Sequence, residues 1–135
     1  VYKRQVYKGV LADHAKGVFQ GKIFVHPEAQ KTDGYQMNRA LLLSDKAEID
    51  SKPELEIYAD DVRCSHGATV GELEEEHLFY LKARGINAGA ARRLLVEAYI
   101  GEVIDEIQSQ SIKEALSKVA SDLLKKKLFE RSNER

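Results

Sequence analysis

The spacing of apolar positions along this chain changes near residue 72. Before that point, short segments rich in apolar and β-branched residues are separated by turn-forming clusters at 26–28, 32–34 and 44–46. Leu55 and Ile57 alternate with polar neighbours, as a half-buried strand requires. The pattern predicts short strands at residues 17–20, 22–25, 39–43, 54–58 and 61–64.

No two-residue Asn-Gly or Asp-Gly turn joins two cleanly alternating segments, so the pattern does not favour tight hairpins. Many short strands without hairpins indicate a solenoid, in which each coil stacks on its neighbour, although a sandwich or barrel also fits. At roughly 20 to 25 residues per coil, residues 1–71 would form about three coils. Because so short a solenoid leaves strand edges unpaired, we expect a partner, a longer parent protein, or self-association of the isolated chain.

From residue 72 onward the pattern is helical. The first predicted helix covers residues 72–84 and is ended by Gly85 at the C′ position. Asn87 is the predicted N-cap of a second helix that runs to about residue 108. Its apolar arc is wide, so we expect neighbours on two sides. A capping box at 111–114 predicts the start of a third helix. The expected domains are therefore 1–71, built of β coils, and 72–135, built of helices.

Composition narrows the functional classes. The 21 basic and 22 acidic residues give a formal net charge of −1, so no global charge attracts nucleic acid or anionic membrane. The basic run at 125–127 fits a solvated helix end. A single cysteine fits a reducing compartment, and no signal-peptide layout or membrane-spanning apolar run is present. We expect a soluble, cytoplasmic protein that binds neither nucleic acid nor membrane.

The segment ADDVRCSHGATVG, residues 59–71, carries the candidate chemistry, because it places Cys64 two positions from His66. Thiolate and imidazole are common ligands of soft and borderline metals. On an extended backbone these two side chains share one face. Two ligands do not close a site, so the others would come from elsewhere or from another chain. An inert pair on the inner face of a strand fits the same pattern.

Other candidate ligands are weaker. Asp60 and Asp61 offer hard oxygen atoms but also fit a turn at a strand end. His14, His26 and His77 have no partner at ligand spacing and are interpreted as surface or capping residues.

Three segments carry a family resemblance: KPELEIYADDVRCSHGATVG (52–71), GVFQGKIFVHPEAQKTDGYQMNRALLLSDKAEID (17–50) and HLFYLKARGI (77–86). They resemble the SufB/SufD family of iron–sulfur cluster assembly proteins over residues 7–108. Cys64-Ser65-His66-Gly67 is similar to the SufD-type pattern, whereas SufB-type members resemble EHEA at residues 65–68 and carry a functional cysteine where this chain has Ile57.

The resemblance implies a right-handed parallel β-helix followed by a C-terminal helical domain, as the C-terminal part of a longer protein. It implies a scaffold without turnover that pairs with a SufB-type subunit and docks the SufC ATPase through its helices. His66, with Cys64, would bind transient iron or a nascent iron–sulfur cluster at the subunit interface. No cofactor is then expected in the isolated chain.

Two other functions fit the sequence less well. A carbohydrate-acting or carbohydrate-binding β-helix needs paired carboxylates and stacking aromatic residues, and this chain has no tryptophan. A thiol enzyme would use Cys64 with His66, but no third orienting residue or oxyanion-hole motif accompanies them.

Overall fold

The computed structural model describes residues 1–126. The chain divides into two compact units, Val1–Glu72 and a second that begins at Leu73, and each is described by itself. The first unit contains five strands of ten residues each: β1 (Tyr2–Leu11), β2 (Lys16–Val25), β3 (Asp33–Leu42), β4 (Glu48–Ile57) and β5 (Arg63–Glu72).

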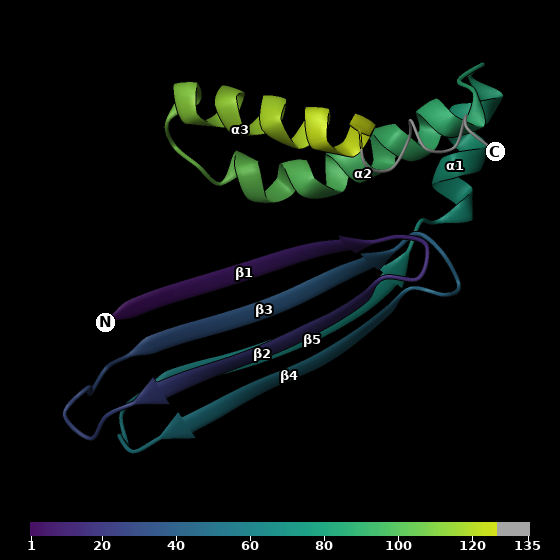
Figure 1. Ribbon diagram of the computed structural model, residues 1–135. Coiled ribbons are helices and arrows are strands. Elements are labelled where there is room, and N and C mark those ends of the chain that lie inside the picture. Colours follow the sequence, from purple (N-terminus) through teal and green to yellow (C-terminus); the bar gives the residue numbers. More distant parts are fainter. Residues whose placement is uncertain (127–135) are drawn as a thin grey trace. The chain divides into compact units, whose positions relative to one another are not determined.

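The five strands form two sheets in which all pairs are parallel (Figure 1). One sheet has the order β1-β3-β5, and the other pairs β2 with β4. From β1 to β5, each strand therefore lies in the opposite sheet from the strand before it. Parallel neighbours need a long crossover connection, and here the strand of the opposite sheet supplies it.

One circuit of the chain, from the start of a strand to the start of the next strand in the same sheet, is longer than the sequence predicted. The first circuit runs from Tyr2 to its register partner Asp33, and the next runs from Asp33 to Arg63. The expectation of roughly 20 to 25 residues per coil is therefore wrong. The predicted strands at 17–20 and 22–25 form one strand through Gly21, and β1 was not predicted.

The space between the two sheets is apolar at one end and polar in the middle. Leu11, Ala40 and Ala47 form the buried apolar cluster. Further along β3, Gln36 and Asn38 are only 2% and 5% exposed. The Asn38 amide crosses between the sheets and donates a 2.5 Å hydrogen bond from Nδ2 to the Ser51 hydroxyl. Because unpaired buried polar groups are costly, this bond specifies how the two sheets face each other.

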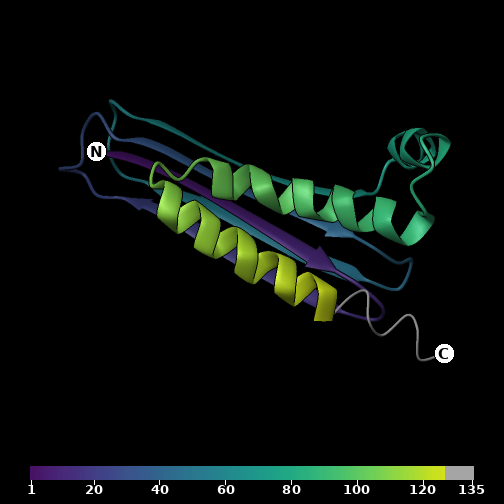
Figure 2. The ribbon, with the colours of Figure 1, turned by 90° about the horizontal axis from the view of Figure 1, so that it is seen from above.

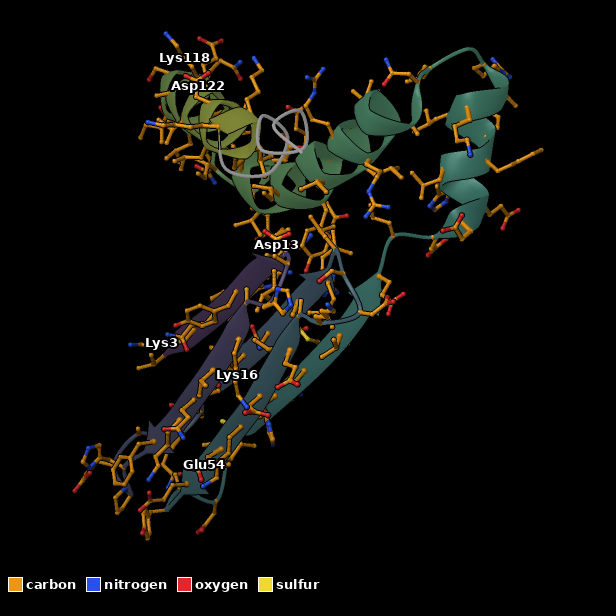
Figure 3. The ribbon with its side chains drawn as sticks, turned by 45° about the vertical axis from the view of Figure 1, so that its right-hand side comes forward. Lys3, Asp13, Lys16, Glu54, Lys118 and Asp122 are labelled. Atoms are coloured by element: carbon orange, nitrogen blue, oxygen red, sulfur yellow. The ribbon has the colours of Figure 1, made fainter. Side chains whose placement is uncertain are left out.

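Ion pairs cover the outer face of β2 and β4, where Figure 3 labels Lys16 and Glu54. Lys16 Nζ lies 3.4 Å from a carboxylate oxygen of Glu48, and Lys22 Nζ lies 2.8 Å from one of Glu56. The hydrogen bond from Lys22 lowers the pKa of the Glu56 carboxyl below its ordinary value. These side chains are exposed, so each pair contributes little to stability.

The second unit contains α1 (Glu75–Ala83), α2 (Ala88–Asp105) and α3 (Gln110–Leu124). Gly85 follows α1 with φ of 85°, which confirms the predicted glycine terminator. The Asn87 side chain accepts a 2.9 Å hydrogen bond from the Ala90 amide and so confirms the second predicted cap. The capping box at 111–114 is wrong, because Ser109 is the N-cap and makes no side-chain cap bond.

Helix α2 packs against both α1 and α3, as its wide apolar arc predicted. Ala91 and Val96 are fully buried, and Figure 2 shows α2 and α3 side by side. The Ser121 hydroxyl of α3 donates a 3.1 Å hydrogen bond to Glu97 of α2. Within residues 1–126, no helix is long and apolar enough to cross a membrane. Of the predicted basic run, Lys125 and Lys126 are exposed, and Lys127 lies outside the described residues.

Candidate metal-ligand site

The two candidate ligands lie together on strand β5. This strand is the last in its sheet, and no strand among the described residues pairs with its outer edge. Cys64 is in register with Gly34, and His66 with Gln36. Register partners on parallel strands present their side chains to the same face. Cys64 and His66 therefore share one face of β5, as the i, i+2 spacing predicted, and this face looks toward the opposite sheet.

Cys64 occupies space that a glycine leaves open. Its thiol forms no disulfide within the described residues and is half-buried. A Cβ added at Gly34 would lie 3.3 Å from the Cys64 sulfur and 3.5 Å from Ile23 Cγ2. The thiol thus leans over β3 toward the interior of the unit, so only part of it is reachable from the strand edge.

His66 is exposed at the strand edge and continues a row of polar side chains across three strands. Gln5 on β1 is in register with Gln36 on β3, and Gln36 with His66 on β5. Gln36 Nε2 donates a 3.1 Å hydrogen bond to Gln5 Oε1. Gln36 Oε1 is buried and accepts no hydrogen bond from any residue of the described chain.

The sequence pattern did not reveal this polar row, because it predicted no strand over residues 33–38. The available signal was alternation, since Gln36 and Asn38 lie on one face and Tyr35 and Met37 on the other. A second signal was that His66, one circuit after Gln36, places another polar side chain on the same face of the sheet. The alternation is visible in the sequence itself, whereas the second signal needs the true length of a circuit.

The pair supplies two ligands at most from residues 1–126. No group of three or more histidine, cysteine, aspartate or glutamate side chains is close enough there to hold a metal ion. A soft or borderline metal normally takes four or more donors. Any further ligand would have to come from beyond the described residues.

The other candidates lie elsewhere. Asp60 and Asp61 form the turn before β5, where the Asp61 carbonyl accepts a 2.5 Å hydrogen bond from the Lys31 amide. The predicted strand start at residue 61 is therefore two positions early. His26 packs edge-on against the Phe24 ring at 4.6 Å. His77 Nδ1 lies 3.3 Å from a Glu74 carboxylate oxygen on the helical unit. His14 is exposed in the turn after β1.

Comparison with known proteins shows which protein family this sequence resembles. Residues 2–99 match the model of the SufBD core domain, described as SUF system FeS cluster assembly. An iron–sulfur cluster assembly SufBD family protein of Synechocystis sp. is 46% identical over 87% of this chain and 26% of its own length. Iron–sulfur cluster assembly protein SufD of Escherichia coli is 45% identical over 82% of this chain and 26% of its own. The chain thus spans about a quarter of the length of these relatives.

Proposed function

This chain belongs to the SufBD family of SUF-system iron–sulfur cluster assembly proteins, and from that premise we propose that it acts as a SufD-type scaffold segment without turnover of its own. The observation that carries the proposal is the placement of Cys64 and His66 side by side on a strand whose outer edge is unpaired within the described chain. The family match gives no support to the carbohydrate-acting alternative.

We propose that the five strands are coils of a right-handed parallel β-helix. Three observations support this fold: the strands alternate between two sheets, every pair is parallel, and each circuit returns the chain to its own sheet in continuous register. Stacking of further coils would continue the same ladders, because each strand already presents its backbone groups to a parallel neighbour.

We propose that the β5 edge pairs with a SufB-type subunit. An unpaired strand edge offers a row of N–H and C=O groups to a second chain. His66 and Cys64 would then lie at the interface, where the partner supplies the remaining ligands for iron or a nascent cluster. Iron and the cluster are cargo in this scheme. The isolated chain should bind iron weakly, since residues 1–126 offer two ligands at most at this site.

The same unpaired edges support self-association of the isolated chain. Two copies can join strand edge to strand edge when no partner occupies them. Light scattering at micromolar concentration should show dimers or larger species. A monodisperse monomer under these conditions contradicts edge pairing between copies.

We propose that the helical unit docks the SufC ATPase. Tyr99 and Ile100 of α2 are half-buried, so charged substitutions there would disturb folding as well as binding. Helix α3 offers a cleaner surface. Ile112, Leu116, Val119 and Leu123 follow a 4-3-4 spacing and are 51%, 42%, 55% and 53% exposed. That spacing forms one apolar seam on the helix.

Leu116→Glu tests this docking surface, because it introduces a charge into the exposed seam without emptying a core. We expect the full-length protein to lose co-purification with the ATPase while its helical content and thermal midpoint stay unchanged. Lys118→Glu is the matched control on the same helix, outside the seam. Unchanged ATPase capture by Leu116→Glu excludes the seam.

His66→Ala tests the scaffold proposal in the complex with both partners. Removing an exposed edge side chain creates no core cavity, so the protein should stay folded, while cluster absorbance per folded complex after reconstitution should fall. Ser65→Ala, on the opposite face of β5, is the matched control. A destabilised His66→Ala protein with full cluster yield per folded complex would show that His66 is structural.

Alkylation of Cys64 separates the scaffold from a thiol enzyme. A thiol enzyme loses turnover when its nucleophile is blocked, whereas a scaffold has none to lose. Hydrolase and transferase substrates can be assayed before and after alkylation. Turnover that disappears on alkylation would contradict the scaffold proposal.

A further inference from the structure

The buried amide of Gln36 lies in register with the candidate ligand His66, and its oxygen accepts no hydrogen bond within the described residues. We infer that the side-chain carbonyl of Gln36 accepts a hydrogen bond from the His66 imidazole, and so fixes which ring nitrogen faces a bound metal. Gln36 is thus a positioning residue. This inference rests on the proposed role of His66 as a ligand.

The first support is the cost of the present arrangement. Gln36 is only 2% exposed, and its Oε1 accepts no hydrogen bond from any part of the chain that the structure describes. A buried acceptor without a donor costs roughly 1 to 3 kcal/mol. A donor that reaches Oε1 would remove this cost.

The second support is that the Gln36 amide turns its nitrogen, and not its oxygen, toward β1. Gln36 Nε2 already donates a 3.1 Å hydrogen bond to Gln5 on that side. Gly21 on the opposite sheet leaves room for the carboxamide, since an added Cβ there would collide with Oε1 and lie 2.8 Å from Gln36 Cδ. The oxygen is therefore left for a donor that enters the interior from the β5 side.

The third support is that His66 is the donor in reach. Adjacent parallel strands lie about 4.8 Å apart, which places register partners within hydrogen-bonding distance of long side chains. His66 is the register partner of Gln36, and its ring is exposed. Ala68, next along the same face, has no side-chain donor, and Cys64 leans over Gly34 instead.

The chemical consequence is control of the tautomer. An imidazole that donates one N–H to a fixed carbonyl presents the lone pair of its other nitrogen outward. Metal-bound histidines commonly make such a second bond, and losing it costs about 10- to 100-fold in metal affinity. Gln36 would thus aim the free nitrogen of His66 at the unpaired strand edge.

The test uses the whole chain and the ¹⁵N shifts of the His66 ring, which report the tautomer directly. We expect one dominant tautomer in the wild type and in Gln36→Glu, which keeps an acceptor. Gln36→Met, of similar shape, should give a mixture. Asn38→Ala is the control, because it removes another buried amide of β3 that is in register with Ala68. It should leave the His66 tautomer unchanged.

Titration with Co²⁺ as the only metal distinguishes the ligand role of His66 from the positioning role of Gln36. Gln36→Met should bind Co²⁺ about tenfold more weakly than the wild type, and His66→Ala should lose the remaining binding. Wild-type Co²⁺ binding by His66→Ala would overturn the ligand role itself. If His66→Ala loses Co²⁺ while Gln36→Met keeps both the wild-type tautomer and affinity, then water satisfies Gln36 and the positioning role is overturned.

Discussion

The Cys64 thiol fills the volume that a side chain at position 34 would need. An added Cβ at Gly34 would lie 3.3 Å from the Cys64 sulfur, closer than most real Cβ contacts. The half-buried state of this cysteine therefore depends on a glycine in the neighbouring strand, one full circuit earlier in the chain.

Gly34→Ala should expose the thiol. The sulfur lies on an edge strand and can rotate outward to relieve the close contact, so alkylation of Cys64 should become faster. The protein should lose about 1 kcal/mol of stability through overpacking. Gly71→Ala is the matched control, because an added Cβ there meets nothing within 4 Å. Slower or unchanged alkylation in Gly34→Ala would contradict this account of the contact.

Gly21→Ala should be the more damaging substitution. Its Cβ would collide with the buried amide of Gln36 and lie 2.8 Å from Phe19 Cζ. We expect a loss of about 1 to 3 kcal/mol in the free energy of unfolding, measured by urea denaturation. Shortening Gln36 to alanine removes the main obstacle, so the double variant should be more stable than the sum of the single effects predicts. Strict additivity would show that the two side chains do not compete for space.

Gly101→Ala should stabilise the helical unit. Gly101 lies inside α2, and an added Cβ meets nothing within 4 Å. Replacing glycine by alanine in a helix interior gains roughly 0.5 to 1 kcal/mol. Thermal unfolding followed by helical circular dichroism measures the change. A lower midpoint would mean that α2 needs a flexible or close-packed position there.

The Lys22–Glu56 pair should make a small, pH-dependent contribution. Hydrogen bonds from Lys22 and then Tyr58 lower the pKa of Glu56 in the folded chain. A carboxyl whose pKa is lower when folded stabilises the protein above its unfolded pKa, and this is lost as pH falls through the folded pKa. Glu56→Gln should therefore be less stable than the wild type at neutral pH and equal to it in acid. High salt should shrink the neutral-pH difference, because the pair is exposed.

The sequence predicted the order of β and helical parts, the Asn87 cap and the Gly85 terminator, because each depends on nearby residues. The ends of the strands were harder to predict from the sequence. Gly21 looked like a break between two short strands, but its missing side chain makes room for Gln36 from the opposite sheet. When a residue makes room for a side chain of the opposite sheet, the residues next to it in the sequence do not reveal that contact.

The candidate site divides in the same way. The i, i+2 spacing placed Cys64 and His66 on one face without any knowledge of the fold. Their neighbours Gly34 and Gln36 come from the preceding circuit, and only the register identifies them. The predicted cap of α3 was wrong because Ser109 and Ser111 both suit an N-cap, and the helix begins directly after Ser109.

The circuit length also governs how this chain reaches its structure. Within Val1–Glu72, every strand pair joins segments that lie a full circuit apart, as Tyr2 does with Asp33, and no two consecutive strands share a ladder. The first ladder bond in either sheet must therefore close a long loop before any pairing energy repays the lost entropy. Domains dominated by such distant pairings fold in milliseconds to seconds, far more slowly than helical bundles. The helical unit is built from segments that are neighbours in the sequence, so it should fold before the sheets.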